Sequence, residues 1–171
     1  AAADLNTNIV MLLQGDEPLI LPDQIDHIIY EIIKNLDFDS WNATANLMEE
    51  KDLLTKSLVK CEIEKDGNIH NFFRVSNNKD NFSKQKKNIK KILGLIAYKK
   101  ECLIQLKNTS PSQKELKESI EQFRIIENNF SLKSIEVDKS IPSVNEPGEL
   151  DIVIKELEIN KEQLNILRKI N

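Results

Sequence analysis

The sequence has few of the residues that many cofactor and metal sites require. Among its 171 residues are four glycines, two cysteines and two histidines, and aromatic residues make up 5%. So few glycines exclude a glycine-rich loop of the Walker or dinucleotide-binding kind within this sequence. The two cysteines, Cys61 and Cys102, lack the spacing of a zinc site and indicate reduced, partly buried thiols. We therefore expect a cytoplasmic protein whose chemistry depends on other side chains.

Positive charge is also scarce. The net charge is −4 and the isoelectric point is near 5.4. Proteins that bind nucleic acid polymers or anionic membranes usually carry a basic excess, so neither partner is expected. No apolar run is long enough to span a bilayer. With 40% hydrophobic and 30% charged residues, the composition instead predicts one globular domain with an ordinary core.

The most informative stretch is an apolar run at residues 9–13 that leads into Gln-Gly-Asp-Glu-Pro at residues 14–18. A short apolar run followed by glycine, acids and proline is typical of a buried strand that stops abruptly. Such a strand delivers its carboxylates to the edge of a sheet, where carboxylates commonly hold a divalent metal against a nucleotide. Asp16 is therefore the candidate metal ligand, and an acidic surface turn is the alternative.

Beyond this motif, predicted helices and strands alternate along the chain. A turn signal at residues 65–68 joins two alternating segments, so residues 57–75 are predicted to form a β-hairpin subdomain. The Asn- and Lys-rich residues 76–88 are predicted to be a mobile loop. This order favours a layered α/β fold with a mostly parallel sheet and an antiparallel hairpin excursion. Helices are expected at residues 25–36, 49–54, 99–106, 110–128 and 150–167, and further strands at residues 41–47, 92–98 and 131–137.

Residues 11–20 resemble the metal-binding signature of the 3-deoxy-manno-octulosonate (Kdo) cytidylyltransferases. Further sequence motifs that resemble those of the family recur in the same order along the chain, which makes chance similarity a poor explanation. The family makes CMP-Kdo from CTP and the sugar acid, releasing pyrophosphate, for lipopolysaccharide or capsule synthesis. The resemblance implies a GT-A-like nucleotidyltransferase fold, Mg²⁺ as the cofactor, and a homodimer. The matching phrases lie at residues 59–67, 72–74, 93–100, 119–124 and 143–150.

The resemblance also implies roles for individual residues. Asp16 matches the catalytic metal ligand, and Asn145 stands where the family usually presents a second metal-binding aspartate. Glu17 is interpreted as an acid that shapes the loop. Glu121 and Gln122 are expected to lie on a helix, with at least one of them facing the site. The residues implied to bind substrate are Gln14, Arg74, Glu121 and Gln122.

Departures from the family pattern leave more than one function open. The family's arginine-containing phosphate-binding loop does not precede residue 9, so residues 1–171 are interpreted as a single nucleotidyltransferase domain that is incomplete at its N-terminus. Asn145 brings no charge to a metal, and Ile92 and Ile96 replace a histidine and a tyrosine of the family's sugar pocket. Two hypotheses follow: a cytidylyltransferase for Kdo or a related sugar acid, and a catalytically impaired relative that binds nucleotide or a partner. A UDP- or GDP-sugar pyrophosphorylase shares the fold class but explains the ordered phrases less well.

Overall fold

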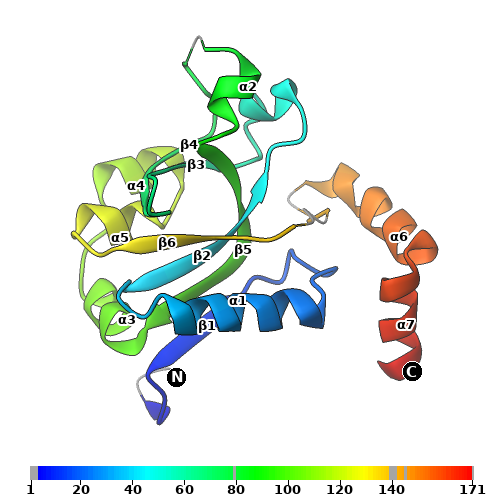
Figure 1. Ribbon diagram of the computed structural model, residues 1–171, viewed down its shortest axis with the longest axis horizontal. Coiled ribbons are helices and arrows are strands. Elements are labelled where there is room, and N and C mark those ends of the chain that lie inside the picture. Colours follow the sequence, from blue (N-terminus) through cyan, green and yellow to red (C-terminus); the bar gives the residue numbers. More distant parts are fainter. Residues whose placement is uncertain (1–3, 79, 139–141, 145, 171) are drawn as a thin grey trace.

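The computed structural model of the chain describes residues 4–78, 80–138, 142–144 and 146–170 (Figure 1). Among these residues, six strands form one sheet with helices on both of its faces, so the α/β class is confirmed. The strands are β1 (Ile9–Leu13), β2 (Ser40–Asn46), β3 (Lys60–Ile63), β4 (Ile69–Phe73), β5 (Ile89–Lys99) and β6 (Leu132–Glu136). The helices are α1 (Pro22–Lys34), α2 (Phe82–Gln85), α3 (Lys100–Lys107), α4 (Gln113–Glu118), α5 (Phe123–Glu127), α6 (Leu150–Ile159) and α7 (Lys161–Ile170), with 3-10 turns η2 (Glu50–Leu53) and η3 (Pro147–Glu149).

Strand β5 organises the sheet, because it pairs with three other strands. β2 runs antiparallel along one edge of β5, and β6 lies parallel to β2 on its outer side. The other edge of β5 is shared end to end: β3 pairs with residues 89–91 and β1 with residues 95–99. The sheet is thus mixed, and the expectation of mostly parallel strands is corrected. Since β3, β4 and β5 follow one another without a long crossover helix, they pair as antiparallel neighbours.

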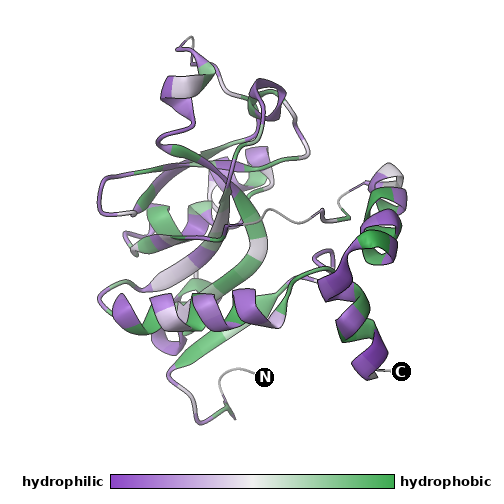
Figure 2. Ribbon diagram, turned by 45° about the vertical axis from the view of Figure 1, so that its right-hand side comes forward, coloured by the Kyte–Doolittle hydropathy of each residue, from purple (hydrophilic) through white to green (hydrophobic). Residues whose placement is uncertain are grey.

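Side chains alternate along β5 between two layers of core. Leu95 and Ala97 point into a cluster with the buried side of α1, whereas Ile96 and Tyr98 point into a second cluster with α3 and α5. α1 begins with a proline in its first turn, as helices often do, and buries Ile28 on the sheet. Figure 2 shows hydrophobic residues along much of the long curved strand β5, and helices around it that carry both hydrophobic and hydrophilic residues.

The predicted hairpin forms from β3 and β4, and Gly67 takes the left-handed backbone conformation (φ 83°) that its turn requires. The turn also lies against β6. The backbone nitrogen of Ser134 donates to the carbonyl of Gly67 at 2.9 Å, and that of Leu132 donates to the side chain of Asn68 at 3.2 Å. Within residues 76–88, the short helix α2 forms where only a loop was expected. The mobility of that segment stays a prediction.

Two of the predicted long helices are each divided in the structure. The helix expected over residues 110–128 ends at Ser119, whose left-handed conformation (φ 53°) stops α4, and α5 begins only at Phe123. The final helix is interrupted at Asn160. Its side-chain oxygen accepts from the backbone nitrogens of Glu162 and Gln163, at 3.0 and 3.3 Å, and so caps α7. Helical periodicity alone predicted neither interruption.

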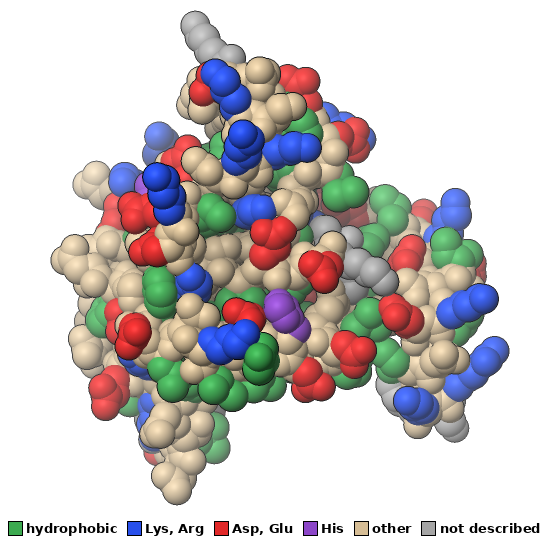
Figure 3. All heavy atoms as spheres, in the orientation of Figure 1, with side chains coloured by type: hydrophobic (Ala, Val, Ile, Leu, Met, Phe, Trp, Pro, Cys, Tyr) green, Lys and Arg blue, Asp and Glu red, His purple; other side chains and the backbone are tan. Residues whose placement is uncertain are grey.

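Several large apolar side chains stay at the surface. Ile29 and Ile33 of α1 are both exposed, and Figure 3 shows hydrophobic side chains gathered on this face of the molecule around α1. None of the helices that the structure describes is long and apolar enough to cross a membrane.

Candidate functional site

An irregularity in β5 creates the candidate site. β1 and β3 leave residues 92–94 of β5 without a strand partner on their shared edge. Opposite β2, the same stretch bulges, since residues 92–96 of β5 face only residues 42–44 of β2. Bulges of this kind redirect side chains and are common beside functional sites. A cavity of about 780 Å³ opens beside the bulge.

The cavity collects segments that are far apart in the sequence. It is lined by the turn after β1, the residues before β3, the bulge of β5, the turn between α4 and α5, and parts of residues 143–146. The substrate and metal residues implied by the resemblance converge on it, except for Asn145, which lies outside the described residues. Sequence reasoning missed Lys91 and Glu115, which also line it. The residues implied by the resemblance that do line the cavity are Gln14, Asp16, Arg74, Glu121 and Gln122.

The turn after β1 is bonded directly to the bulge. The backbone nitrogen of Gln14 donates to the carbonyl of Gly94 at 2.7 Å, and the Glu17 carboxylate accepts from the backbone nitrogen of Gly94 at 2.7 Å. Burial raises the pKa of the Glu17 carboxyl, against the opposing effect of the Gly94 hydrogen bond. Glu17 therefore shapes the loop, as the sequence suggested, and holds Asp16 at the cavity.

Asp16 carries the one buried side-chain oxygen or nitrogen that lacks a hydrogen-bond partner in the described part of the chain. That atom is its carboxylate oxygen Oδ1. The backbone carbonyl of Asp16 accepts from the nitrogen of Val144 at 2.9 Å, so the loop position is fixed. A buried carboxylate oxygen without a donor is costly unless a cation or ligand meets it. The described residues contain no cluster of three or more His, Cys, Asp or Glu side chains that could hold a metal ion.

Gly94 is expected to tolerate no side chain. A Cβ atom added there would lie 2.8 Å from both Gln14 Oε1 and Glu17 Cγ. We therefore predict that Gly94→Ala displaces the turn after β1 and lowers the free energy of unfolding by about 1–3 kcal/mol, measured by urea denaturation. Gly148→Ala is the matched control, because its added Cβ would meet nothing within 4 Å. Equal stability of the two variants would contradict the close packing of the turn on the bulge.

Arg74 is held by backbone carbonyls at one side of the cavity. Its Nε donates to the carbonyl of Glu118 at 2.7 Å, Nη1 to that of Lys56 at 3.0 Å, and Nη2 to that of Ser119 at 3.0 Å. The guanidinium thereby ties the segment before β3 to the end of α4. Its predicted contact with an anionic substrate group stays a prediction, and these three bonds show that Arg74 also shapes the cavity wall.

Lys60, like Arg74, donates hydrogen bonds to backbone carbonyls around the cavity wall. Its ammonium is fully buried and donates to the carbonyls of Thr55 and Leu58, both at 2.7 Å, and to that of Arg74. Burial lowers the pKa of Lys60 from 10.5 to about 8, because desolvation disfavours the charged form, while Asp52 opposes this change. Lys60 and Arg74 thus hold this wall of the cavity through hydrogen bonds to backbone carbonyls. The alternating pattern of the strand around Lys60 did not predict this role.

The Lys60 pKa predicts a specific pH dependence of stability. Its folded-state pKa lies below the unfolded value of 10.5, so the unfolded chain holds more protons between pH 8 and 10.5. Lys60 should therefore make a contribution to the free energy of unfolding that rises with pH across this window, by roughly 1–2 kcal/mol between about pH 7 and about pH 9.5. The thiols of Cys61 and Cys102 oppose this rise in every variant, because burial raises the pKa of each. Urea denaturation should therefore show that the difference in the free energy of unfolding between Lys65→Met, an exposed control, and Lys60→Met grows by this amount. A difference that stays constant with pH would contradict it.

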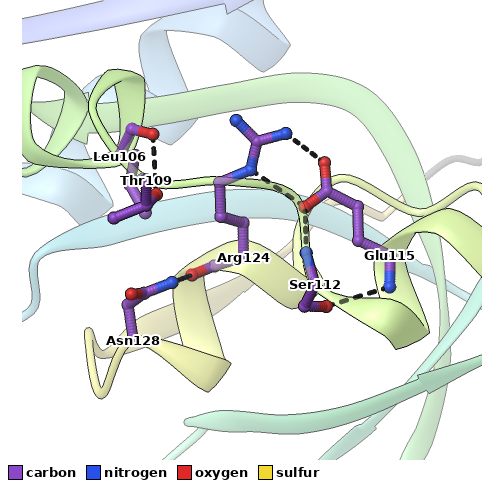
Figure 4. A network of polar contacts seen from close by, with 6 residues as sticks. All are labelled: Leu106, Thr109, Ser112, Glu115, Arg124 and Asn128. Atoms are coloured by element: carbon purple, nitrogen blue, oxygen red, sulfur yellow. Dashed lines mark hydrogen bonds and ion pairs between the residues drawn. The ribbon is translucent and has the colours of Figure 1, made fainter.

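The turn between α4 and α5 is held by an ion pair (Figure 4). Arg124 donates from Nε to a carboxylate oxygen of Glu115 at 2.9 Å and from Nη2 to the other oxygen. Ser112 caps α4, accepting from the backbone nitrogen of Glu115 at 3.0 Å. Glu121 and Gln122 lie in the enclosed turn rather than on a helix, which corrects the expectation from the sequence. Because a turn is not restricted to helical directions, both side chains reach the cavity.

Of the two isoleucines that depart from the family pattern, only one borders the cavity. Ile92 lines it, whereas Ile96 is buried in the core cluster beneath α3 and α5. The change at residue 96 therefore alters packing rather than the polarity of the cavity.

The architecture matches that of a solved enzyme structure. A solved structure of a CMP:2-keto-3-deoxy-manno-octonic acid synthetase complexed with CTP superposes with a TM-score of 0.79, at 22% sequence identity, over 91% of this chain and 64% of that chain. The chain therefore has a nucleotidyltransferase fold, as the sequence predicted.

The family follows from the sequence comparison. The cytidylyltransferase family model matches residues 1–141, and the chain belongs to that family. It is 32% identical to the 3-deoxy-manno-octulosonate cytidylyltransferase of Geotalea daltonii and 30% identical to that of Geotalea uraniireducens. Both alignments cover 91% of this chain but 66% of the relative, so the chain spans slightly less than two thirds of the relatives' length.

Proposed function

We propose that this protein transfers CMP from CTP to the anomeric hydroxyl of a Kdo-like sugar acid, for lipopolysaccharide or capsule synthesis. The observation that carries the proposal is the buried, unpartnered carboxylate oxygen of Asp16, in a cavity that also holds Gln14, Glu121 and Gln122. Membership in the cytidylyltransferase family and the similarity to 3-deoxy-manno-octulosonate cytidylyltransferases support this choice of substrates.

The reaction is a displacement at phosphorus. The sugar hydroxyl oxygen forms a bond to the α-phosphorus, the bond from that phosphorus to the bridging oxygen breaks, and pyrophosphate leaves while the hydroxyl proton passes to solvent or a base. Asp16 would hold Mg²⁺, which when bound stabilises negative charge on phosphate oxygens. Within the chain, Gly94 and Glu17 fix the turn that carries Asp16, and Arg74 and Lys60 fix the facing wall. Placement of reacting groups by a rigid wall is itself a large part of such catalysis.

The acceptor that we propose belongs to the class of Kdo-like sugar acids. An isoleucine at residue 92 gives the wall an apolar patch, and a site that lacks a hydrogen-bonding side chain discriminates less against changed hydroxyls. Kdo itself, or a relative with an amino substituent, fits this description. A catalytically impaired relative that binds nucleotide without turnover is the second candidate, because Asn145 lacks the charge of the family aspartate.

We also propose that the protein is cytoplasmic and forms a homodimer. A cytoplasmic location is supported by the two cysteines, both free thiols. Homodimer formation is supported by the outer edge of β4, which pairs with no other strand among those described and so offers a surface for pairing. Light scattering of the purified protein tests the dimer, and a monomer at micromolar concentration would overturn it.

Nucleotide binding tests the proposal before turnover does. Isothermal titration calorimetry should show that CTP binds in the presence of Mg²⁺, and that EDTA weakens this binding about tenfold or more, since Asp16 would hold a cation that offsets the negative charge of the triphosphate. UTP and ATP are the matched nucleotides and should bind more weakly. Binding of CTP without turnover would favour the impaired relative. No preference among the three nucleotides would overturn the assignment to cytidine.

A further inference from the structure

Asn42 satisfies the backbone of the β5 bulge from the side opposite to Gln14 and Glu17. It lies on β2 and is fully buried, with 0% of its surface exposed. Its amide nitrogen Nδ2 donates to the carbonyls of Ala43 at 2.9 Å, Leu93 at 3.0 Å and Leu95 at 3.3 Å. Three carbonyl oxygens can be faced only by a donor, so the carboxamide of Asn42 has one possible orientation.

The fixed orientation of Asn42 determines that of Gln122. The oxygen Oδ1 of Asn42 lies 3.3 Å from the amide nitrogen Nε2 of Gln122. Because Oδ1 can only accept, the atom facing it must be the nitrogen of Gln122, and the oxygen Oε1 must point elsewhere. Gln122 is 6% exposed and lines the cavity. The backbone of the bulge thus sets the direction of a carboxamide at the cavity wall through one intermediate side chain.

We propose that Asn42 is a positioning residue that makes Gln122 present a hydrogen-bond acceptor to a hydroxyl group of the acceptor substrate. This inference rests on the proposed function of the cavity. Ile92 and Ile120 also line the cavity, so the wall offers apolar surface as well as the Gln122 carboxamide. A ligand that lacks the matching hydroxyl leaves that oxygen unpaired, which is the basis of strong discrimination.

The orientation can be tested in the unliganded wild-type chain, without any variant that could fail to fold. We expect the side-chain amide protons of Gln122 to exchange with solvent at least about tenfold more slowly than those of exposed Gln105, because a hydrogen bond and burial protect them. Gln163 is the internal reference for a held carboxamide, since its nitrogen donates to the carbonyl of Leu19. NMR exchange of Gln122 as fast as that of Gln105 would overturn the inference.

Kinetics test the consequence for substrate. Asn42→Ser and Gln122→Met should each raise the KM for Kdo about tenfold, as expected for one lost hydrogen bond, and leave the KM for CTP within about twofold. The double variant should be no worse than either single variant, because both break the same contact. Additive effects, or an equal rise in the KM for CTP, would overturn the positioning role. A wild type without turnover would instead contradict the proposed function, and the exchange measurement would then decide this inference alone.

Discussion

Asp16→Asn should reduce turnover by at least about 10²–10³-fold, the largest effect on activity that we expect from a single substitution. Asparagine keeps the size of the side chain but removes the negative charge that would hold the cation against the phosphates. The buried Oδ1 of Asp16 has no hydrogen-bond partner among the described residues, and we propose that a cation meets it there. The rate of pyrophosphate release from CTP in the presence of Kdo and Mg²⁺ measures the effect.

Stability separates this role from a structural one. Because Oδ1 receives no hydrogen bond, Asp16→Asn should leave the free energy of unfolding unchanged or slightly raised. Asp37→Asn makes the same chemical change at an exposed position and should alter neither activity nor stability. An Asp16→Asn variant that retains wild-type turnover would show that the residue forms only an acidic turn. A variant that loses activity together with stability would assign Asp16 to the fold instead.

Arg124→Leu should destabilise the protein by about 2–4 kcal/mol, the largest stability effect that we expect. The substitution leaves the carboxylate of Glu115, whose side chain is 10% exposed, without its two charge-assisted hydrogen bonds. It also releases the turn that carries Glu121 and Gln122, so the KM for Kdo should rise as well. Arg168→Leu, at an exposed position of α7, is the matched control and should cost at most about 0.5 kcal/mol. Urea denaturation measures both.

The difference in the free energy of unfolding between the wild type and Arg124→Leu should depend on pH because of Glu115. Its pKa lies below the ordinary value of 4.5, chiefly because Arg124 donates hydrogen bonds to the carboxylate. A depressed folded-state pKa contributes stability above the unfolded value, and that contribution is lost as the pH falls through the folded value. The gap in stability between wild type and Arg124→Leu should therefore be constant above about pH 5 and shrink below about pH 4. A gap that stays constant in acid would show that the pair contributes packing rather than charge.

Local patterns predicted much of this fold. The abrupt end of β1 at the Gln-Gly-Asp-Glu-Pro motif, the hairpin around Gly67 and the amphipathic α1 all follow from short-range signals, namely apolar periodicity and turn residues. The motif also predicted that Asp16 would lie at a sheet edge, and the structure places it at the cavity beside β5. These features depend on residues close together in the sequence, which is why sequence reasoning reached them.

The parts that were missed depend on contacts between distant segments. Gly94 within an apolar run was the available signal for the bulge of β5, yet the strand pairing that defines the bulge involves residues 42–44, about fifty positions away. The interruption at Ser119 is stabilised by Arg74 and Arg124, which no periodicity could reveal. Likewise, the resemblance implied only that Arg74 binds substrate, which stays a prediction, and it did not reveal the three carbonyls from remote segments that accept hydrogen bonds from the guanidinium.

Pyrophosphate release is the most direct test of the proposed cytidylyltransfer. The natural protein is supplied with CTP, Kdo and Mg²⁺, and with each pair of these components as controls, and the products are followed by ³¹P NMR. We predict that pyrophosphate and a CMP-sugar diester appear together only when all three components are present. Pyrophosphate that forms without the sugar acid, or its absence from the complete mixture while CTP still binds, would contradict transfer to a Kdo-like acceptor.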